Sequence, residues 1–218
     1  PEAVQESTVA LGAGVGVAFD GDADRAVFSD EKGRLINGDR TMAIWCAHWA
    51  HEGALDPAIV VGTVMSNSGF EKYMASQGVT LVRTPVGDKH VAEKLRETGA
   101  KVGGEQSGHI IFPEYAPTGD GLITALEFLR VVKREGRPAS EFYGDFESWP
   151  QLLVNVKVSD QRGWESVPSV AEALVGAQGR LDGRGRMVVR ASGTQPMLRV
   201  MVEADDAALC DAAADEIV

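Results

Sequence analysis

Three aspartates at alternate positions, Asp20, Asp22 and Asp24, carry the clearest chemical signal in the sequence. Three like charges within five residues repel one another unless water screens them or a cation neutralises them. They follow directly on the apolar run Val15–Phe19, which predicts a buried strand, where screening by water is poor. Oxygen ligands suit hard cations, and Mg²⁺ is favoured over calcium because three close carboxylates leave room for waters and a phosphate oxygen. A Mg²⁺ site is the first hypothesis, and a solvated acidic turn without metal is its alternative.

The same acidic spacing opens the calcium loop of an EF-hand, but two features exclude that motif. Arg25 occupies the sixth position, where the sharp turn needs glycine, and the flanking residues predict strands rather than helices.

A second candidate site is the loop Arg190–Pro196, between two predicted strands. It offers the hydroxyls of Ser192 and Thr194, backbone amides around Gly193 and a guanidinium at Arg190, and Arg199 follows just beyond it. Such a loop can hold a phosphate dianion, and the alternative is an ordinary hairpin turn. Arginines on both sides, in an otherwise acidic chain, favour phosphate.

Two further loops each follow a predicted strand. In Gly103–His109, Glu105 and Ser107 can hold sugar hydroxyls, and His109 can move a proton near neutral pH. Lys89 lies in the loop after the preceding strand and is expected at the same edge of the sheet, where ligands of open α/β sheets bind. For each loop a purely structural role, as a tight turn or a helix start, is the open alternative.

Strands and helices alternate over most of the first 148 residues, which predicts an α/β domain with a mixed, largely parallel sheet. After the expected strand–acidic loop–strand at the start, the sequence predicts a helix capped by Asp39 and a long helix with Leu122, Leu126 and Leu129 at helical spacing. The other expected elements are strands at 58–62, 79–83 and 101–103 and helices at 68–77 and 88–98.

The pattern changes after a linker predicted near Ser148-Trp149-Pro150. Three strands, at 152–158, 187–191 and 197–202, a short helix at 169–176 and a helical tail from Asp205 predict a small α+β domain with an antiparallel sheet.

Composition limits the classes of partner. The chain has 218 residues, 44% of them hydrophobic, and a formal net charge of −11, which argues against nucleic acid as a partner. Cys46 and Cys210 lie in unrelated contexts, which indicates reduced thiols and an intracellular, cytoplasmic setting. No stretch is long enough to predict a membrane span.

Taken in order, the acidic, sugar and phosphate loops resemble those of the α-D-phosphohexomutase superfamily. The matching motifs are Asp20-Gly21-Asp22-Ala23-Asp24-Arg25, Gly104-Glu105-Gln106-Ser107-Gly108-His109 and Arg190-Ala191-Ser192-Gly193-Thr194. Within the superfamily the chain is most similar to the bacterial phosphoglucosamine mutases, which interconvert glucosamine 6-phosphate and glucosamine 1-phosphate through a phosphoserine and a bisphosphorylated sugar. Gln106 stands where phosphomannomutase/phosphoglucomutase relatives usually carry Met.

The resemblance implies a role for each loop. Three aspartates would hold Mg²⁺, with Arg25 neutralising charge at the transferring phosphoryl group, and His109 and Lys89 would be candidates for proton transfer. Glu105 and Ser107 would bind sugar hydroxyls. The remaining phosphate would be gripped by Arg190, Ser192, Gly193, Thr194 and Arg199. The implied domains are 1–38, the end of a metal-binding domain, 39–148, an α/β sugar-binding domain, and 149–218, an α+β phosphate-binding domain.

Two departures accompany the resemblance. Gln195 stands where the family usually has Glu, and the Thr/Ser-Ala-Ser-His-Asn-Pro loop that carries the phosphoserine is absent from the sequence. The chain is therefore expected to be inactive alone and to need N-terminal domains of the same protein. Alternatives are a mutase for mannose or glucose phosphates and a non-catalytic sugar-phosphate-binding module, and a homo-oligomer is left open.

Overall fold

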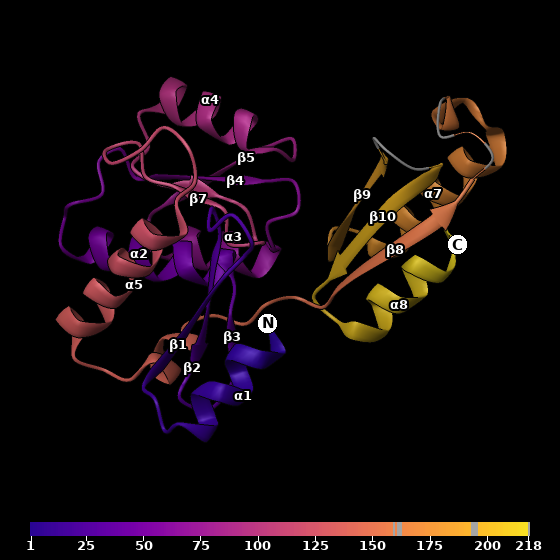
Figure 1. Ribbon diagram of the computed structural model, residues 1–218. Helices are drawn as coiled ribbons and strands as arrows, with labels where there is room; N and C mark the ends of the chain where they lie inside the picture. The colour runs from indigo at the N-terminus through magenta and orange to yellow at the C-terminus, as the bar shows by residue number, and fades with distance from the viewer. Residues whose placement is uncertain (159, 161–162, 193–195, 218) are drawn as a thin grey trace. The chain divides into compact units, whose positions relative to one another are not determined.

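The computed structural model describes residues 1–158, 160, 163–192 and 196–217. They form two compact units, Pro1–Glu147 and Ser148–Val218 (Figure 1). The boundary lies where the sequence predicts the linker.

The first unit contains a four-stranded sheet in the order β5-β4-β6-β7. Its strands are β4 (Ile59–Thr63), β5 (Thr80–Thr84), β6 (Gly103–Gly104) and β7 (Ile110–Ile111). β4 pairs in parallel with β5 and β6, and β7 is antiparallel to β6, so the prediction of a mixed, largely parallel sheet is confirmed.

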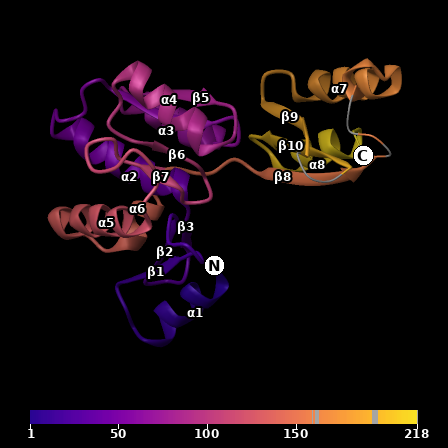
Figure 2. The ribbon, with the colours of Figure 1, turned by 45° about the horizontal axis from the view of Figure 1, so that its top comes forward.

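Helices cover both faces of this sheet. They are α2 (Gly38–His51), α3 (Ser68–Ser76), α4 (Asp88–Thr98), α5 (Gly121–Glu135) and α6 (Ala139–Tyr143). Val91 and Leu95 of α4 pack with Val61 on one face. The larger core on the other face, which includes Val60, collects side chains from α2, α3 and α5. Figure 1 shows α4 on one side of β4 and β5 and α2 and α3 on the other, and Figure 2 shows α5 beside α2.

Residues 1–36 add a helix and a separate antiparallel sheet to the same unit. They are α1 (Glu2–Ala10), β1 (Val15–Phe19), β2 (Ala26–Asp30) and β3 (Leu35–Ile36), with the strands in the order β1-β2-β3. The prediction of a buried strand before the aspartates is wrong, because β1 is an edge strand with half-buried residues and an exposed Phe19. α1 packs on β1 and β2 and was not predicted.

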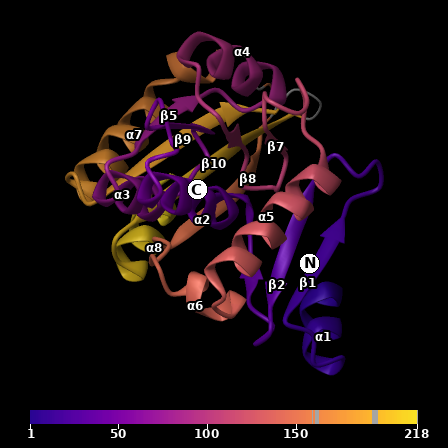
Figure 3. The same ribbon diagram turned by 90° about the vertical axis from the view of Figure 1, so that its left-hand side faces the viewer.

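α5 joins the antiparallel sheet β1-β2-β3, which we call the hairpin, to the rest of the unit. Phe128 of α5 stacks on Phe28 of β2 with ring centroids 4.1 Å apart, and Figure 3 shows the helix beside the strand. The helix was predicted from the helical spacing of Leu122, Leu126 and Leu129, but these three leucines are exposed and do not form its buried face. Its buried face is instead the one that carries Phe128.

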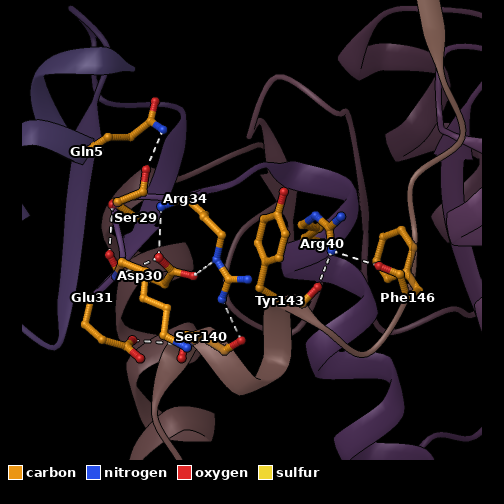
Figure 4. Close-up of polar contacts among 11 residues, drawn as sticks. Gln5, Ser29, Asp30, Glu31, Arg34, Arg40, Ser140, Tyr143 and Phe146 are labelled. Atoms are coloured by element: carbon orange, nitrogen blue, oxygen red, sulfur yellow. Dashed lines mark hydrogen bonds and ion pairs between the residues drawn. The ribbon is translucent and has the colours of Figure 1, made fainter. Parts of the chain in front are cut away.

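A polar cluster at the base of the hairpin makes a second connection (Figure 4). The fully buried Asp30 accepts hydrogen bonds from the backbone N–H of Arg34 (2.8 Å) and from its Nε (2.7 Å). Arg34 Nη2 in turn donates to the carbonyl of Ser140 at 2.8 Å. Ser140 N also donates to Glu31 Oε2 at 3.1 Å, so α6 is held to the turn between β2 and β3.

Tyr143 lies between two guanidinium groups. Arg34 Cζ is 4.2 Å and Arg40 Cζ is 3.8 Å from the centroid of its ring. Arg40 Nη1 also donates to the carbonyls of Tyr143 (2.7 Å) and Phe146 (3.1 Å). The segment before the linker is thereby held to both α2 and the hairpin.

The start of α2 differs from the prediction. Asn37 is the N-cap, and its side chain accepts from Arg40 N at 3.1 Å. Asp39, the expected cap, lies in the first turn and is buried. Asn and Asp are about equally good caps, so the sequence did not distinguish positions two residues apart.

The second unit is an antiparallel sheet in the order β8-β10-β9 with two helices. Its elements are β8 (Gln151–Lys157), a 3-10 turn (Trp164–Ser166), α7 (Pro168–Leu181), β9 (Gly185–Ala191), β10 (Met197–Ala204) and α8 (Ala207–Asp215). Leu181 and Cys210 pack with Val200 and Val202 in one core, so both helices cover the same face of the sheet. α7 continues past the predicted end at residue 176 because Ala177 and Leu181 are buried in that core.

Both cysteines, Cys46 and Cys210, are free and buried. Among the residues that the structure describes, no helix has both the length and the apolar character needed to span a membrane.

Candidate functional site

The metal loop, Asp20–Arg25, connects β1 to β2. One carboxylate oxygen from each of Asp20, Asp22 and Asp24 lies within 4.8 Å of the others, the one such group found in the described part of the chain. Ligands of an octahedral Mg²⁺ ion are about 3 Å apart when adjacent and about 4.2 Å apart when opposite, so these oxygens need to approach one another by at most about 2 Å to hold an ion. Donor type and spacing both fit Mg²⁺.

The environment of Asp24 also suits a cation. Burial raises the pKa of this carboxyl above its usual range, the charges of Asp22 and Asp20 raise it further, and His109 opposes them. A divalent cation would reverse this effect, because it stabilises the ionised form.

Arg25 is in contact with two of the three carboxylates. Its Nε lies 3.4 Å from Asp20 Oδ2 and 3.7 Å from Asp24 Oδ1, and its backbone N–H donates to Asp20 Oδ1 at 3.3 Å. The side chain is half-exposed, so the guanidinium can also meet an incoming anion.

His109 meets the metal loop, although it is 85 positions further along the chain than Asp24. It forms an isolated antiparallel β-bridge with Arg25, and Gly108 accepts a hydrogen bond from Ala26 N at 3.1 Å. The side chain is 7% exposed, and its Nε2 lies 3.4 Å from Asp24 Oδ2. His109 therefore faces a predicted metal ligand from a nearly closed position.

Two glycines at the start of α5, Gly119 and Gly121, allow this approach, and neither was predicted to have a role. A Cβ on Gly119 would lie 2.5 Å from the His109 ring, and one on Gly121 would lie 2.6 Å from the Arg25 carbonyl. Gly121 N also donates to Ala23 O at 2.9 Å. The available signal was a pair of glycines flanking Asp120, which caps α5 by accepting from Ile123 N.

The sugar loop, Gly103–His109, is closed by its own backbone. Glu105 N donates to His109 O at 2.9 Å, and Gly108 N donates to Glu105 O at 3.0 Å. The Glu105 carboxylate accepts from Gly87 N (2.9 Å) and from Ser107 Oγ (3.4 Å). The two predicted sugar-binding side chains are thus adjacent and held in place.

A cavity of about 400 Å³ separates the metal loop from the sugar loop. Asp20 and Arg25 line one side, and Gln106 and Ser107 line another, with Phe19 among the apolar side chains. This volume lies in the range of small-molecule sites, and charged groups border it.

Lys89 lies in the first turn of α4, two residues after Gly87. Its side chain is 78% exposed, with Nζ 4.0 Å from Glu93 Oε1. The two candidates for proton transfer therefore differ. His109 is enclosed beside the metal loop, whereas Lys89 is in solvent near Gly87, whose N–H donates to Glu105.

The second unit carries the predicted phosphate loop, Arg190–Pro196, between β9 and β10. Arg190 and Arg199 are direct cross-strand partners, and like charges at such positions are destabilising. Arg186 and Glu203, four residues away on the same two strands, form an ion pair at 2.6 Å. No acidic side chain among the described residues pairs in this way with Arg190 or Arg199.

Three polar atoms at this position are buried and lack a hydrogen-bond partner within the described ranges: the Nε atoms of Arg190 and Arg199 and Ser192 Oγ. Buried donors without partners are costly, and an anion would satisfy them. Gly193 and Thr194, predicted for the same cradle, and Gln195 lie outside the described residues.

Comparison with known proteins agrees with this arrangement. Residues 37–148 match the family model "Phosphoglucomutase/phosphomannomutase, alpha/beta/alpha domain III", and residues 153–218 match the model of the family's C-terminal domain. The chain is 48% identical over 218 residues to a phosphoglucosamine mutase of Cereibacter sphaeroides and 48% identical over 211 residues to one of Gluconacetobacter diazotrophicus. It spans about half the length of these relatives, 49% and 46% respectively.

Solved structures show the same fold. A Burkholderia thailandensis phosphoglucomutase/phosphomannomutase family protein matches 99% of this chain with a TM-score of 0.77 at 22% identity, over 48% of its own length. An Aspergillus fumigatus N-acetylphosphoglucosamine mutase, crystallised with GlcNAc-6P and magnesium, matches 92% of this chain and 50% of its own with a TM-score of 0.74 at 24% identity. The chain therefore belongs to the phosphoglucomutase/phosphomannomutase family, within the α-D-phosphohexomutases.

Proposed function

We propose that the protein to which this chain belongs is a phosphohexomutase that interconverts glucosamine 6-phosphate and glucosamine 1-phosphate. The observation that carries the proposal is the joining of metal loop and sugar loop through the Arg25–His109 bridge, with a cavity between them. The specific sugar is supported by the 48% identity to phosphoglucosamine mutases.

In this proposal Asp20, Asp22 and Asp24 hold Mg²⁺, which would supply positive charge where a phosphoryl group is transferred. Arg25 adds a guanidinium beside the same carboxylates. Such groups lower the barrier because they are already in place when charge develops on the phosphoryl oxygens.

Ser107, which lines the cavity, and Glu105, whose carboxylate accepts from Ser107 Oγ, bind the sugar hydroxyls. A carboxylate accepts hydrogen bonds from two neighbouring hydroxyls and therefore tolerates a sugar bound in either orientation. Arg190, Ser192 and Arg199 bind the phosphate that is not being transferred, together with the predicted Gly193 and Thr194.

A proton must leave the sugar hydroxyl when it receives the phosphoryl group. His109 and Lys89 remain the proposed groups, and their surroundings suggest different uses. His109 lies 3.4 Å from Asp24 and can hold a proton beside the metal loop, whereas Lys89 is free to approach an anion from solvent.

The phosphoserine donor is proposed to lie in other domains of the protein, because its motif does not occur in the sequence. Those domains are the principal proposed partners of this chain, besides the small-molecule sugar phosphate. Without them this chain should bind sugar phosphate but show no turnover. The free thiols of both cysteines support a cytoplasmic location. We do not expect nucleic acid or a membrane as a partner, and oligomer formation remains open to measurement.

A mutase for mannose or glucose phosphates is the second candidate, favoured by the name of the family model that matches residues 37–148. Turnover of the glucosamine, mannose and glucose 6-phosphates by the complete protein separates the two. A kcat/KM for glucosamine 6-phosphate at least about tenfold above the others, a difference of about 1.4 kcal/mol, supports the first. Equal or reversed preference refutes it.

The metal assignment is tested by Asp22→Asn in the complete protein, with exposed Asp211→Asn in α8 as the matched control. The first variant should need far more Mg²⁺ for half-maximal activity, because one carboxylate ligand has lost its charge. Wild-type Mg²⁺ dependence in Asp22→Asn would show that the ligand assignment is wrong.

A further inference from the structure

The first turn of α2 contains a buried carboxylate, Asp39, for which the proposed function has no use. Its residue is 1% exposed, and it lies two positions after the N-cap Asn37. The positive end of the helix dipole favours a negative charge there. Burial of a carboxylate is nevertheless costly, so the groups that it binds indicate its role.

Asp39 Oδ2 accepts hydrogen bonds from two loops. Asn67 N donates at 2.9 Å, and Gln106 Nε2 donates at 3.4 Å. Asn67 ends the loop after β4 and caps α3 through its own side chain, which accepts from Gly69 N at 2.9 Å. Gln106 lies in the middle of the sugar loop. One carboxylate oxygen thus ties the sugar loop to the end of a central strand.

The residue before Asp39 reinforces the same contact. Gly38 N donates to Gln106 O at 3.0 Å. The backbones are so close that a Cβ on Gly38 would collide with the Glu105 carbonyl. The sugar loop therefore rests on the start of α2 through both the backbone and the side chain of Gln106.

We propose that Asp39 is a positioning residue for sugar-phosphate binding, acting through Gln106 on the two side chains that flank it, Glu105 and Ser107. The Gln106 side chain donates a hydrogen bond to Asp39, while the Glu105 carboxylate accepts one from Gly87 N. Because the Gln106 side chain is fixed, its neighbours Glu105 and Ser107 keep one orientation toward the substrate. This role rests on the proposed function, and it concerns the sugar loop alone.

A double-mutant cycle in the complete protein tests the coupling. Asp39→Asn keeps the size of the side chain but removes its charge, and Gln106→Leu removes the donor from the other side. Each should lower kcat/KM for glucosamine 6-phosphate by about tenfold, mainly through KM, since the first variant removes the charge of the acceptor and the second removes the donor. Because both substitutions disrupt the same hydrogen bond between Asp39 and Gln106, the double variant should lose clearly less than the roughly hundredfold that two independent effects would give. The Mg²⁺ concentration for half-maximal activity should not change.

Hydrogen exchange in the present chain tests the same idea without turnover, so a failure of the proposed function is separable from a failure of this inference. In Asp39→Asn the amides of Glu105 and Gly108, which bond within the sugar loop, should exchange faster than in wild type, and that of Asp30, which bonds to Arg34 O in the neighbouring sheet, should not. Additive losses in the cycle, or unchanged exchange in the sugar loop, would overturn the assignment. A parallel loss of Mg²⁺ affinity would also overturn it, since that result indicates a general structural effect.

Discussion

The contact between Gly119 and His109 allows a sharp test of how the metal loop is held. Gly119→Ala adds one methyl group, and this carbon would lie 2.5 Å from both Cε1 and Nε2 of the His109 ring. The backbone of Gly119 is outside the left-handed region, so alanine can adopt its conformation. Any penalty must therefore come from the contact itself.

The size of the penalty follows from the distances. Ordinary van der Waals contact begins near 3.4 Å, so the ring must retreat by about 1 Å. The ring is nearly enclosed, and its Nε2 is 3.4 Å from Asp24 Oδ2, so this shift breaks the pair. Overpacking of this kind costs about 1–3 kcal/mol. For a unit of this size each kcal/mol lowers the Tm by about 2–4 °C.

Gly21→Ala is the matched control, because Gly21 belongs to the metal loop and has no atom within 4 Å of an added Cβ. Its stability should stay within about 0.5 kcal/mol of wild type. Calorimetry of the present chain measures the transition, and hydrogen exchange in α2 assigns it to the first unit. The His109 ring resonances report the displacement. Equal stability of the two variants with unmoved ring resonances would refute the reasoning.

Three further predictions concern other parts of the chain. Without ligand, Arg199→Met should leave the second unit at least as stable as wild type, because the substitution removes the repulsion from Arg190. With phosphate, it should abolish most of the stabilisation, which for wild type reaches about 2.7 kcal/mol at 100 times the Kd. Thermal-shift assays measure both effects. Burial favours the neutral form of Glu31, but hydrogen bonds from Ser140 outweigh it and lower the pKa. Its stabilisation is therefore present above the ordinary pKa of about 4.3 and lost as pH falls through the lowered value; urea unfolding of Glu31→Gln should show less loss over that range, and parallel pH curves would contradict this. Tyr143→Leu should cost about 1–2 kcal/mol in the same urea assay, since two stacked guanidiniums lose their ring; a change below about 0.3 kcal/mol would show that the stack contributes little.

The alternation of strands and helices was predictable because hydrophobic periodicity reports which face of each element is buried. α1 was not predicted because its sequence shows no apolar stripe. The residue that it buries is the polar Thr8. The exposed leucines of α5 show the opposite problem: their helical spacing was correct but did not indicate which face packs on Phe28.

The site divides in the same way. Asp20, Asp22 and Asp24 lie within five residues of the sequence, so their grouping was predictable, and so was a hairpin that brings Arg190 toward Arg199. The contact of His109 with Asp24 was not, because it depends on an isolated bridge between Arg25 and His109, which are 84 positions apart, and on the absence of a side chain at Gly119.

The Arg34–Tyr143–Arg40 stack bears on how this protein can be dissected into separately expressed pieces. A piece that starts at residue 39 would lose Arg34 from one face of Tyr143 and Phe28 from the ring of Phe128. It would expose aromatic surface and leave Ser140 without Arg34 and Glu31. The cut that respects the packing lies after Glu147. A separately expressed piece should therefore contain both the hairpin and the α/β sheet, although the family model that matches this region begins only at residue 37.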